Sequence, residues 1–138
     1  MKTEDAQRML DAARAEAKKM GKAVTIVVVD GSGAPVVLER LDGTAAMTTL
    51  VAEGKAGASV FTGRDSALLK AMADNNPALA AAVAQRLGGR FMPLQGAVVL
   101  RRDGALMGAV GVSGATSEED EQIAKAGAAA VDGGQKLS

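Results

Sequence analysis

The sequence predicts an α+β fold in which helices pack against one antiparallel sheet. Two observations predict this class. Two pairs of apolar, strand-like runs are each joined by a short turn that contains glycine, and segments with helical periodicity precede, separate and follow these pairs. A short turn between two strands makes them antiparallel. The 138 residues have room for one domain, and no linker or repeat divides them, so we expect a single domain over residues 1–138.

The elements are expected in the order helix, hairpin, helices, hairpin, helix. Apolar residues recur at helical spacing over residues 6–20, and the run 24–29 is typical of a strand buried on both faces. Residues 34–40 form the returning strand. A second helix is predicted over 44–61, with an apolar stripe at Met47, Leu50, Val51, Gly54, Ala58 and Phe61. The remaining elements are two shorter helical segments, two strands and a last helix: 65–73, 77–87, 97–100, 105–113 and roughly 117–131.

Charge and composition exclude several classes of function. Sixteen basic and sixteen acidic residues give no net charge, so the chain has no electrostatic basis for binding nucleic acid or an anionic membrane. The absence of histidine and cysteine excludes Ser-His-Asp triads, histidine or thiolate metal sites and cysteine nucleophiles. No apolar run approaches the ~20 residues that span a bilayer, and the first residues lack a secretory signal. We therefore expect a cytoplasmic protein.

The core is expected to consist of small side chains. The chain has 29 alanines and 17 glycines, and its only aromatic residues are Phe61 and Phe91. Each small side chain buries little apolar area, and burial stabilises by only ~25 cal/mol per Å². A homo-oligomer would add buried surface at its subunit contacts, so we expect one.

Residues 108–117, with the sequence GAVGVSGATS, are the most informative segment. They run from a strand through Ser113 and Gly114 into a helix capped by Thr116 or Ser117. The strand face that carries Ser113 has only small side chains near its end, so a neighbouring group must approach closely there. The amides that follow lie at a helix N-terminus and can bind an anion. Alternatively, the glycines only admit a packed helix.

The densest run of charge is Glu118, Glu119, Asp120 and Glu121. Carboxylates at a helix N-terminus stabilise it by ~0.3–1 kcal/mol each, which is sufficient reason for an acidic run there. A magnesium or calcium site is the alternative interpretation. Because the EF-hand pattern is absent, we predict no metal site.

Lys55 is the most prominent candidate among the basic residues. A phosphate-binding loop is rejected, because the upstream glycine is missing and Ala56 replaces the required serine or threonine. Lys55 follows Val51 by one helical turn, at the edge of the apolar stripe. A lysine there usually extends to water. Alternatively, it enters a cleft, where it binds a carboxylate or acts as a base. The same ambiguity applies to Arg40.

Several short motifs occur in a fixed order along nearly the whole chain: VVVD at 27–30 with Gly31 and Gly33, RLDG at 40–43, Lys55-Ala56, Gly104, the run 108–115, Asp120, Ala124 and Gly127. Together they resemble the GlcG/HbpS family, which also includes the C-terminal domain of the corrinoid adenosyltransferase PduO. The resemblance implies a profilin-like fold, with a five-stranded antiparallel sheet flanked by helices, and assembly into homo-oligomers. It also links the chain to haem, to corrinoid enzymes and to the metabolism of small organic acids.

Two functions follow. The first is a binding module for haem or a related carboxylate-bearing molecule, with ligand-binding residues Arg40, Lys55, Gly108, Gly111, Ser113 and Gly114. Without histidine, cysteine or tyrosine, haem iron would be held by methionine, lysine or no protein ligand, so the propionates would lead binding. The second is an isomerase, hydratase or dehalogenase-like enzyme of small unsaturated acids, with catalytic residues Lys55, Ser113, Glu119 and Asp120. A structural oligomer with a vestigial pocket is the third alternative.

Overall fold

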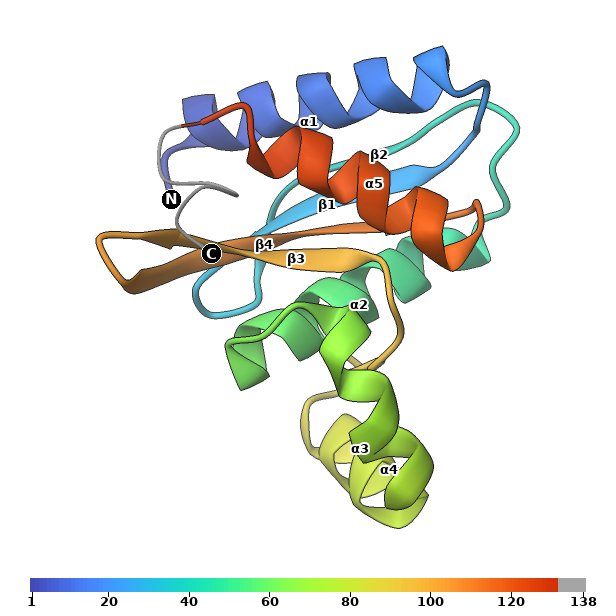
Figure 1. The fold of residues 1–138 in the computed structure, drawn as a ribbon, viewed down its shortest axis with the longest axis vertical. Coiled ribbons are helices and arrows are strands. Elements are labelled where there is room, and N and C mark those ends of the chain that lie inside the picture. The colour runs from blue at the N-terminus through green and yellow to red at the C-terminus, as the bar shows by residue number, and fades with distance from the viewer. Residues whose placement is uncertain (132–138) are drawn as a thin grey trace.

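Two hairpins supply the strands of the sheet, and helices cover both of its faces. The computed structural model describes residues 1–131, so residues 132–138 of the predicted domain lie outside the described residues. The strands are antiparallel in the order β2-β1-β4-β3, with α1 and α5 on one face and α2 on the other (Figure 1). The elements are α1 (Thr3–Lys19), β1 (Thr25–Asp30), β2 (Pro35–Arg40), α2 (Met47–Thr62), the 3₁₀ helix η1 (Ser66–Leu69), α3 (Lys70–Asn75), α4 (Pro77–Arg86), β3 (Ala97–Arg102), β4 (Ala105–Ser113) and α5 (Ser117–Ala128).

This order confirms the α+β class and corrects the number of strands. The sheet formed by residues 1–131 has four strands, whereas the family resemblance implied five. The physical reason is that the two hairpins use all the strand-like runs of the described chain, and the segment between the hairpins is helical. Two helices are also shorter than predicted, because α2 begins at Met47 and α5 ends at Ala128.

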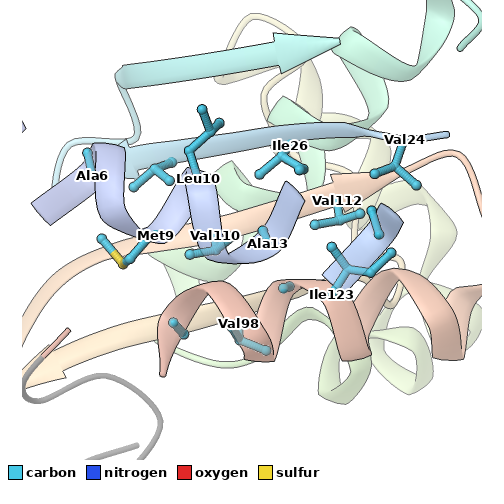
Figure 2. Close-up of a cluster of buried hydrophobic side chains, with 14 of the residues drawn as sticks. Ala6, Met9, Leu10, Ala13, Val24, Ile26, Val98, Val110, Val112 and Ile123 are labelled. Atoms are coloured by element: carbon cyan, nitrogen blue, oxygen red, sulfur yellow. The ribbon is translucent and has the colours of Figure 1, made fainter. Parts of the chain in front are cut away.

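The larger hydrophobic core lies between the sheet and the pair α1 and α5. Alternate residues of each strand point to this face, and the apolar stripe of α1 packs on them. The two helices approach closely at Gly127 of α5. A Cβ at this position would lie 2.9 Å from the carbonyl oxygen of Met9. Figure 2 shows this cluster, which includes Ala6, Met9, Leu10, Ala13, Val24, Ile26, Val98, Val110, Val112 and Ile123.

Helix α2 covers the opposite face with its small and polar residues. Its buried side chains include Thr48, Ala52, Lys55, Ala56 and Ser59. A Cβ at Gly111 of β4 would lie 2.5 Å from the carbonyl oxygen of Ala52, so the close approach of α2 requires glycine at this position. The large residues of the predicted apolar stripe do not form the buried face. Met47 is 67% exposed, Leu50 63% and Phe61 43%.

Residues 70–89, which include α3 and α4, form an arm that extends away from the sheet (Figure 1). The arm bends at the predicted break, where the Asn76 side chain accepts a hydrogen bond from the Leu79 amide and Pro77 begins α4. Neither α3 nor α4 has a fully buried residue. The arm is joined to α2 by a small cluster of Ala58, Leu69 and Phe91.

Asp30 organises the turn of the first hairpin. The Ser32 hydroxyl and the amides of Ser32 and Ala34 donate hydrogen bonds to its carboxylate. These bonds, that of the hydroxyl first, hold the pKa of Asp30 below its ordinary value. A carboxylate with a lowered pKa stabilises the fold above its ordinary pKa, and this contribution is lost as the pH falls through the folded value.

We therefore expect Asp30→Asn to lower the melting temperature at pH 7 by no more than about 2 °C, because the turn is partly exposed to solvent. The difference from the unsubstituted chain should be smaller at pH 3 than at pH 7, because protonation of Asp30 begins to remove the same contribution. Thermal unfolding at both pH values measures this. An equal effect of Asp30→Asn at pH 3 and pH 7 would contradict the electrostatic explanation.

Candidate functional site

Polar residues from β1, β2, β4, α2 and α5 meet at one end of the sheet. Thr25 of β1 pairs with Arg40 of β2 on one side and with Ser113 of β4 on the other. Residues paired directly across strands point to the same face. The Thr25 hydroxyl lies 2.8 Å from that of Thr48, so this face is the one covered by α2. The Thr48 hydroxyl donates to the carbonyl oxygen of Ala45, so Thr25 donates to Thr48.

A buried ion pair lies next to Ser113. The Lys55 ammonium donates to Asp120 Oδ2 at 3.0 Å and to the carbonyl oxygen of Val112 at 3.0 Å. Lys55 is only 4% exposed and Asp120 only 2%. Gly96 closes over the ammonium, because a Cβ there would lie 2.7 Å from Nζ. The structure therefore brings together two of the predicted site residues, and their charges satisfy each other.

This pair also fixes the turn that follows β4. Asp120 Oδ1 accepts a hydrogen bond from the Ala115 amide at 2.9 Å. Burial raises the pKa of Asp120 above its ordinary value, and the positive charge of Lys55 opposes that rise. The pair links α2, the end of β4 and the start of α5, so it holds residues 113–116 in place.

Glu119 completes the N-terminus of α5. The Thr116 hydroxyl accepts from the Glu119 amide, and the Glu119 carboxylate accepts from the Thr116 amide, so of the two predicted caps Thr116 is the one used and Ser117 begins the helix. The bond from the Thr116 amide is the main cause that lowers the pKa of Glu119. Glu119 also pairs with Lys22 at 3.4 Å. These contacts give its carboxylate a structural role.

Three hydrogen-bond donors at this end have no partner within residues 1–131: the Ser113 hydroxyl, the Gly114 amide and the Arg40 guanidinium. Ser113 as a whole is only 7% exposed. Arg40 is exposed and ends β2, which is an edge strand. A carboxylate accepts several hydrogen bonds and binds arginine most strongly. These three residues have the donors that such an anion requires, and we call them the carboxylate site.

An open groove of about 610 Å³ adjoins Arg40 on the α1 side of β2. Small-molecule sites usually measure about 300–1,000 Å³, so this groove has room for one. The Arg14 guanidinium in the groove is paired with the Glu39 carboxylate at 2.6 Å. The Lys18 ammonium has no partner in the described chain. The lining residues are Arg14, Lys18, Gly21, Lys22, Ala23, Glu39, Arg40, Leu41 and Asp42.

The structure separates the three glycines that were predicted to bind a ligand. Gly108 pairs with Asp30 at the far end of β4, and Gly111 lies beneath α2. Gly114 follows Ser113, with its Cα packed against the backbone of residues 23–24. Only Gly114 therefore lies at the carboxylate site.

Thr25 and Thr48 are the residues of this region that sequence reasoning missed. Thr25 is the single polar residue in the strand-like run 24–29, and that interruption was the available signal. Nothing local marked Thr48, because its role depends on how α2 crosses the sheet.

The residues present fit one part of a haem group and not the other. The carboxylate site and the lysines of the groove suit propionates. The iron finds no histidine, cysteine or tyrosine anywhere in the chain, and no methionine lines the groove. The Lys55 ammonium is already bonded to Asp120. The site therefore offers a haem iron no histidine, cysteine, tyrosine or methionine ligand, and Lys18 is the unpaired amine that lines the groove.

These observations define an α+β domain with a polar, anion-compatible site at one end of a four-stranded sheet. Residues 1–129 match the family model described as haem degrading protein HbpS-like. The chain belongs to this HbpS-like family, which confirms the resemblance seen in the motifs.

Solved structures show the same fold. The structure of a PduOC:heme complex superimposes with a TM-score of 0.87 at 27% identity, over 97% of this chain and 96% of that one. A double mutant of Streptomyces reticuli HbpS gives 0.78 at 30% identity, over 95% and 86%. The Klebsiella pneumoniae protein ORFY gives 0.85 at 22% identity, over 94% and 89%, a likeness of fold alone.

No curated protein matches the sequence. Among residues 1–131, no helix combines the length and the apolar character that crossing a membrane requires.

Proposed function

We propose that this domain binds a small molecule that carries carboxylates. Arg40, Ser113 and Gly114 hold the carboxylates of this ligand. The observation that carries the proposal is the Ser113 hydroxyl, which has no partner within residues 1–131, precedes the unpaired Gly114 amide and lies in one cross-strand row with Arg40. The Lys55–Asp120 pair supports the site from behind, because it fixes the turn that presents the Gly114 amide. The groove lies on the α1 side of β2, and Arg40, on this edge strand, is the residue of the carboxylate site that also lines it.

Haem or a related carboxylate-bearing molecule is the proposed ligand. PduOC forms a complex with heme, and the family description refers to haem. In this chain the propionates would bind at the carboxylate site. Bound haem would supply redox chemistry at its iron, whereas the residues of this chain only bind the propionates and orient the ring. A small organic acid would use the same donors.

Arg40→Ala is expected to weaken the binding of ferric haem at least about tenfold, or ~1.4 kcal/mol, because it removes the only charged donor of the site. Lys19→Ala is the matched control, since it removes an exposed cation of α1 that does not line the groove. An absorbance titration in the Soret band measures both affinities. Equal weakening by the two variants would indicate general charge attraction and would contradict the assignment of Arg40.

An enzyme that acts on a small unsaturated organic acid, of the isomerase, hydratase or dehalogenase type, is the second candidate. The observation that favours it is a buried carboxyl of raised pKa, Asp120, paired with Lys55 next to Ser113. In this function the carboxylate site stabilises a developing enolate, and Ser113 or Asp120 handles the proton.

Solvent exchange of the substrate's α-proton tests the enzymatic function. We expect a small unsaturated carboxylate to incorporate deuterium in heavy water with the unsubstituted chain, and at least about a hundredfold more slowly with Ser113→Ala. NMR measures the exchange. No incorporation with the unsubstituted chain, across a panel of mono- and dicarboxylates, would contradict this second function.

Self-association is the third part of the proposal. The core is built largely from alanine and valine, so each buried side chain contributes little area. Burial between copies of the chain compensates for this, and we expect a homo-oligomer at micromolar concentration.

A further inference from the structure

The two outer edges of the sheet differ in how their backbone groups are satisfied. Strand β3 forms one edge, and side chains of the segment before η1 and at its start bind its outward amides. The Ala97 amide donates to the Ser66 hydroxyl at 2.9 Å, and the Val99 amide donates to Asp65 Oδ1 at 2.9 Å. Natural sheets often cover an edge in this way, because an unpaired edge attracts further strands. The edge at β3 is therefore closed.

The opposite edge, formed by β2, is open (Figure 1). The Leu41 amide donates to the carbonyl oxygen of Val24 at 3.0 Å, and hydrogen-bonded pairs alternate along β1 and β2 from this point. By this alternation Glu39 bonds to β1, whereas the backbone groups of Leu38 and Arg40 point away from the sheet. These outward groups, the β2 edge, have no partner in the described part of the chain. Leu38 is also 40% exposed.

The groove described above adjoins the β2 edge on the α1 side, because Arg40 lines it. Two of its cations, Lys18 and Arg40, have no partner in the described chain, against one unpaired acid, Asp42. The other charged residues of the groove are already paired. The unpaired charge beside the β2 edge is therefore net positive, and it complements an acidic partner.

We propose that the β2 edge binds an extended acidic peptide segment as an additional strand. Leu38 and Arg40 offer two amides and two carbonyl oxygens, which pair with the backbone of such a segment. The side chains of the added strand alternate between the two faces of the sheet, so those on the α1 side lie next to the groove. Acidic side chains at these positions face Lys18 and give the edge its selectivity. The inference is independent of the proposed ligand, because it uses backbone groups and Lys18.

The chemistry of the β2 edge disfavours two other occupants. A helix satisfies its own backbone hydrogen bonds, so it does not pair with the outward groups of a strand. A second copy that paired through its own β2 edge would form a twofold contact, with the same surface on both sides. The unpaired cations of both copies would then lie at one interface, where like charges repel. An acidic segment meets neither obstacle.

Amide hydrogen exchange, followed by NMR on the full chain, tests whether the β2 edge is free and whether it is used. The probe is an eight-residue peptide of alternating valine and glutamate, blocked at both ends. We expect the Leu38 and Arg40 amides to exchange rapidly in the chain alone and at least about tenfold more slowly with bound peptide. The Glu39 amide, which faces β1, is the internal reference. Slow exchange at Leu38 and Arg40 without peptide would show that the edge is already covered and would overturn the proposal.

Leu38→Pro tests the backbone pairing. Proline removes the outward amide and is tolerated on an edge strand where the amide faces solvent. We expect the dissociation constant of the fluorescein-labelled peptide, measured by anisotropy, to rise at least about tenfold. Leu38→Ala is the matched control, since it shortens the side chain but keeps the amide, and thermal unfolding reports the fold of both variants. Unchanged affinity in a folded Leu38→Pro variant would place the peptide elsewhere and overturn the proposal.

Lys18→Glu tests the charge selection without altering the strand. Lys18 is exposed on α1, so its substitution leaves the core untouched. We expect Lys18→Glu to weaken binding of the glutamate peptide at least about threefold, and Lys19→Glu, outside the groove, to change it less. A peptide with lysine in place of glutamate should bind the unsubstituted chain at least about tenfold more weakly. Equal affinity for the two peptides, or no binding of the glutamate peptide, would contradict the proposal.

Discussion

Lys55→Ala is expected to lower the free energy of unfolding by about 3–5 kcal/mol, because it leaves the Asp120 carboxylate buried without its charged partner. The carbonyl oxygen of Val112 also loses a hydrogen-bond donor. Asp120→Ala should have a similar effect, since the ammonium then remains buried and unpaired. Urea unfolding of the purified variants measures both changes.

The matched control is Lys70→Ala on the surface of the arm. Lys70 pairs with Asp74, but their side chains are 72% and 59% exposed, so its loss should change stability by less than about 1 kcal/mol. If Lys55→Ala is as mild as Lys70→Ala and weakens ligand binding instead, Lys55 is a ligand-binding residue and the structural role of the pair is refuted.

Gly111→Ala is expected to destabilise the fold by about 3 kcal/mol, at the upper end for overpacking, because a contact with backbone cannot be relieved by a rotamer change. The added Cβ would lie 2.5 Å from the carbonyl oxygen of Ala52 and 2.9 Å from the Cβ of Ala56. Helix α2 would have to move away from the sheet, and Lys55 with it. Thermal and urea unfolding both report this change.

Gly31→Ala serves as the control for this substitution. Its nearest new contact would be the carbonyl oxygen of Leu106 at 3.6 Å, an ordinary van der Waals distance. We expect a change within about 0.5 kcal/mol. A stable Gly111→Ala variant would show that α2 does not pack as closely on β4 as the structure indicates.

The fold was predictable where local sequence determines local structure. The hairpins follow from strand-like runs on either side of glycine-containing turns, and Pro77 marks the break between α3 and α4. The cap at Thr116 could be expected because a threonine precedes a run of acids. These elements match the prediction to within a few residues. The fifth strand came from the family resemblance, and residues 1–131 do not contain it.

The candidate site was predictable only in part, because it depends on which side of α2 meets the sheet. Periodicity favoured the stripe with Met47 and Leu50 as the apolar face and placed Lys55 at its edge. In the structure Lys55 lies on the buried side, where Asp120 neutralises it. A pairing across 65 residues has no local signature. The isolated Thr25 in an apolar run was the one local sign of a polar row.

The comparison of ferric haem with iron-free protoporphyrin tests the central claim most directly. Both carry the same propionates, and only haem offers iron to an axial ligand. We predict that the two bind with dissociation constants within about threefold of each other, since the carboxylate site alone holds them. Both should be weakened by Arg40→Ala. Haem binding at least about tenfold tighter than protoporphyrin, with a Soret band typical of ligated iron, would contradict the account.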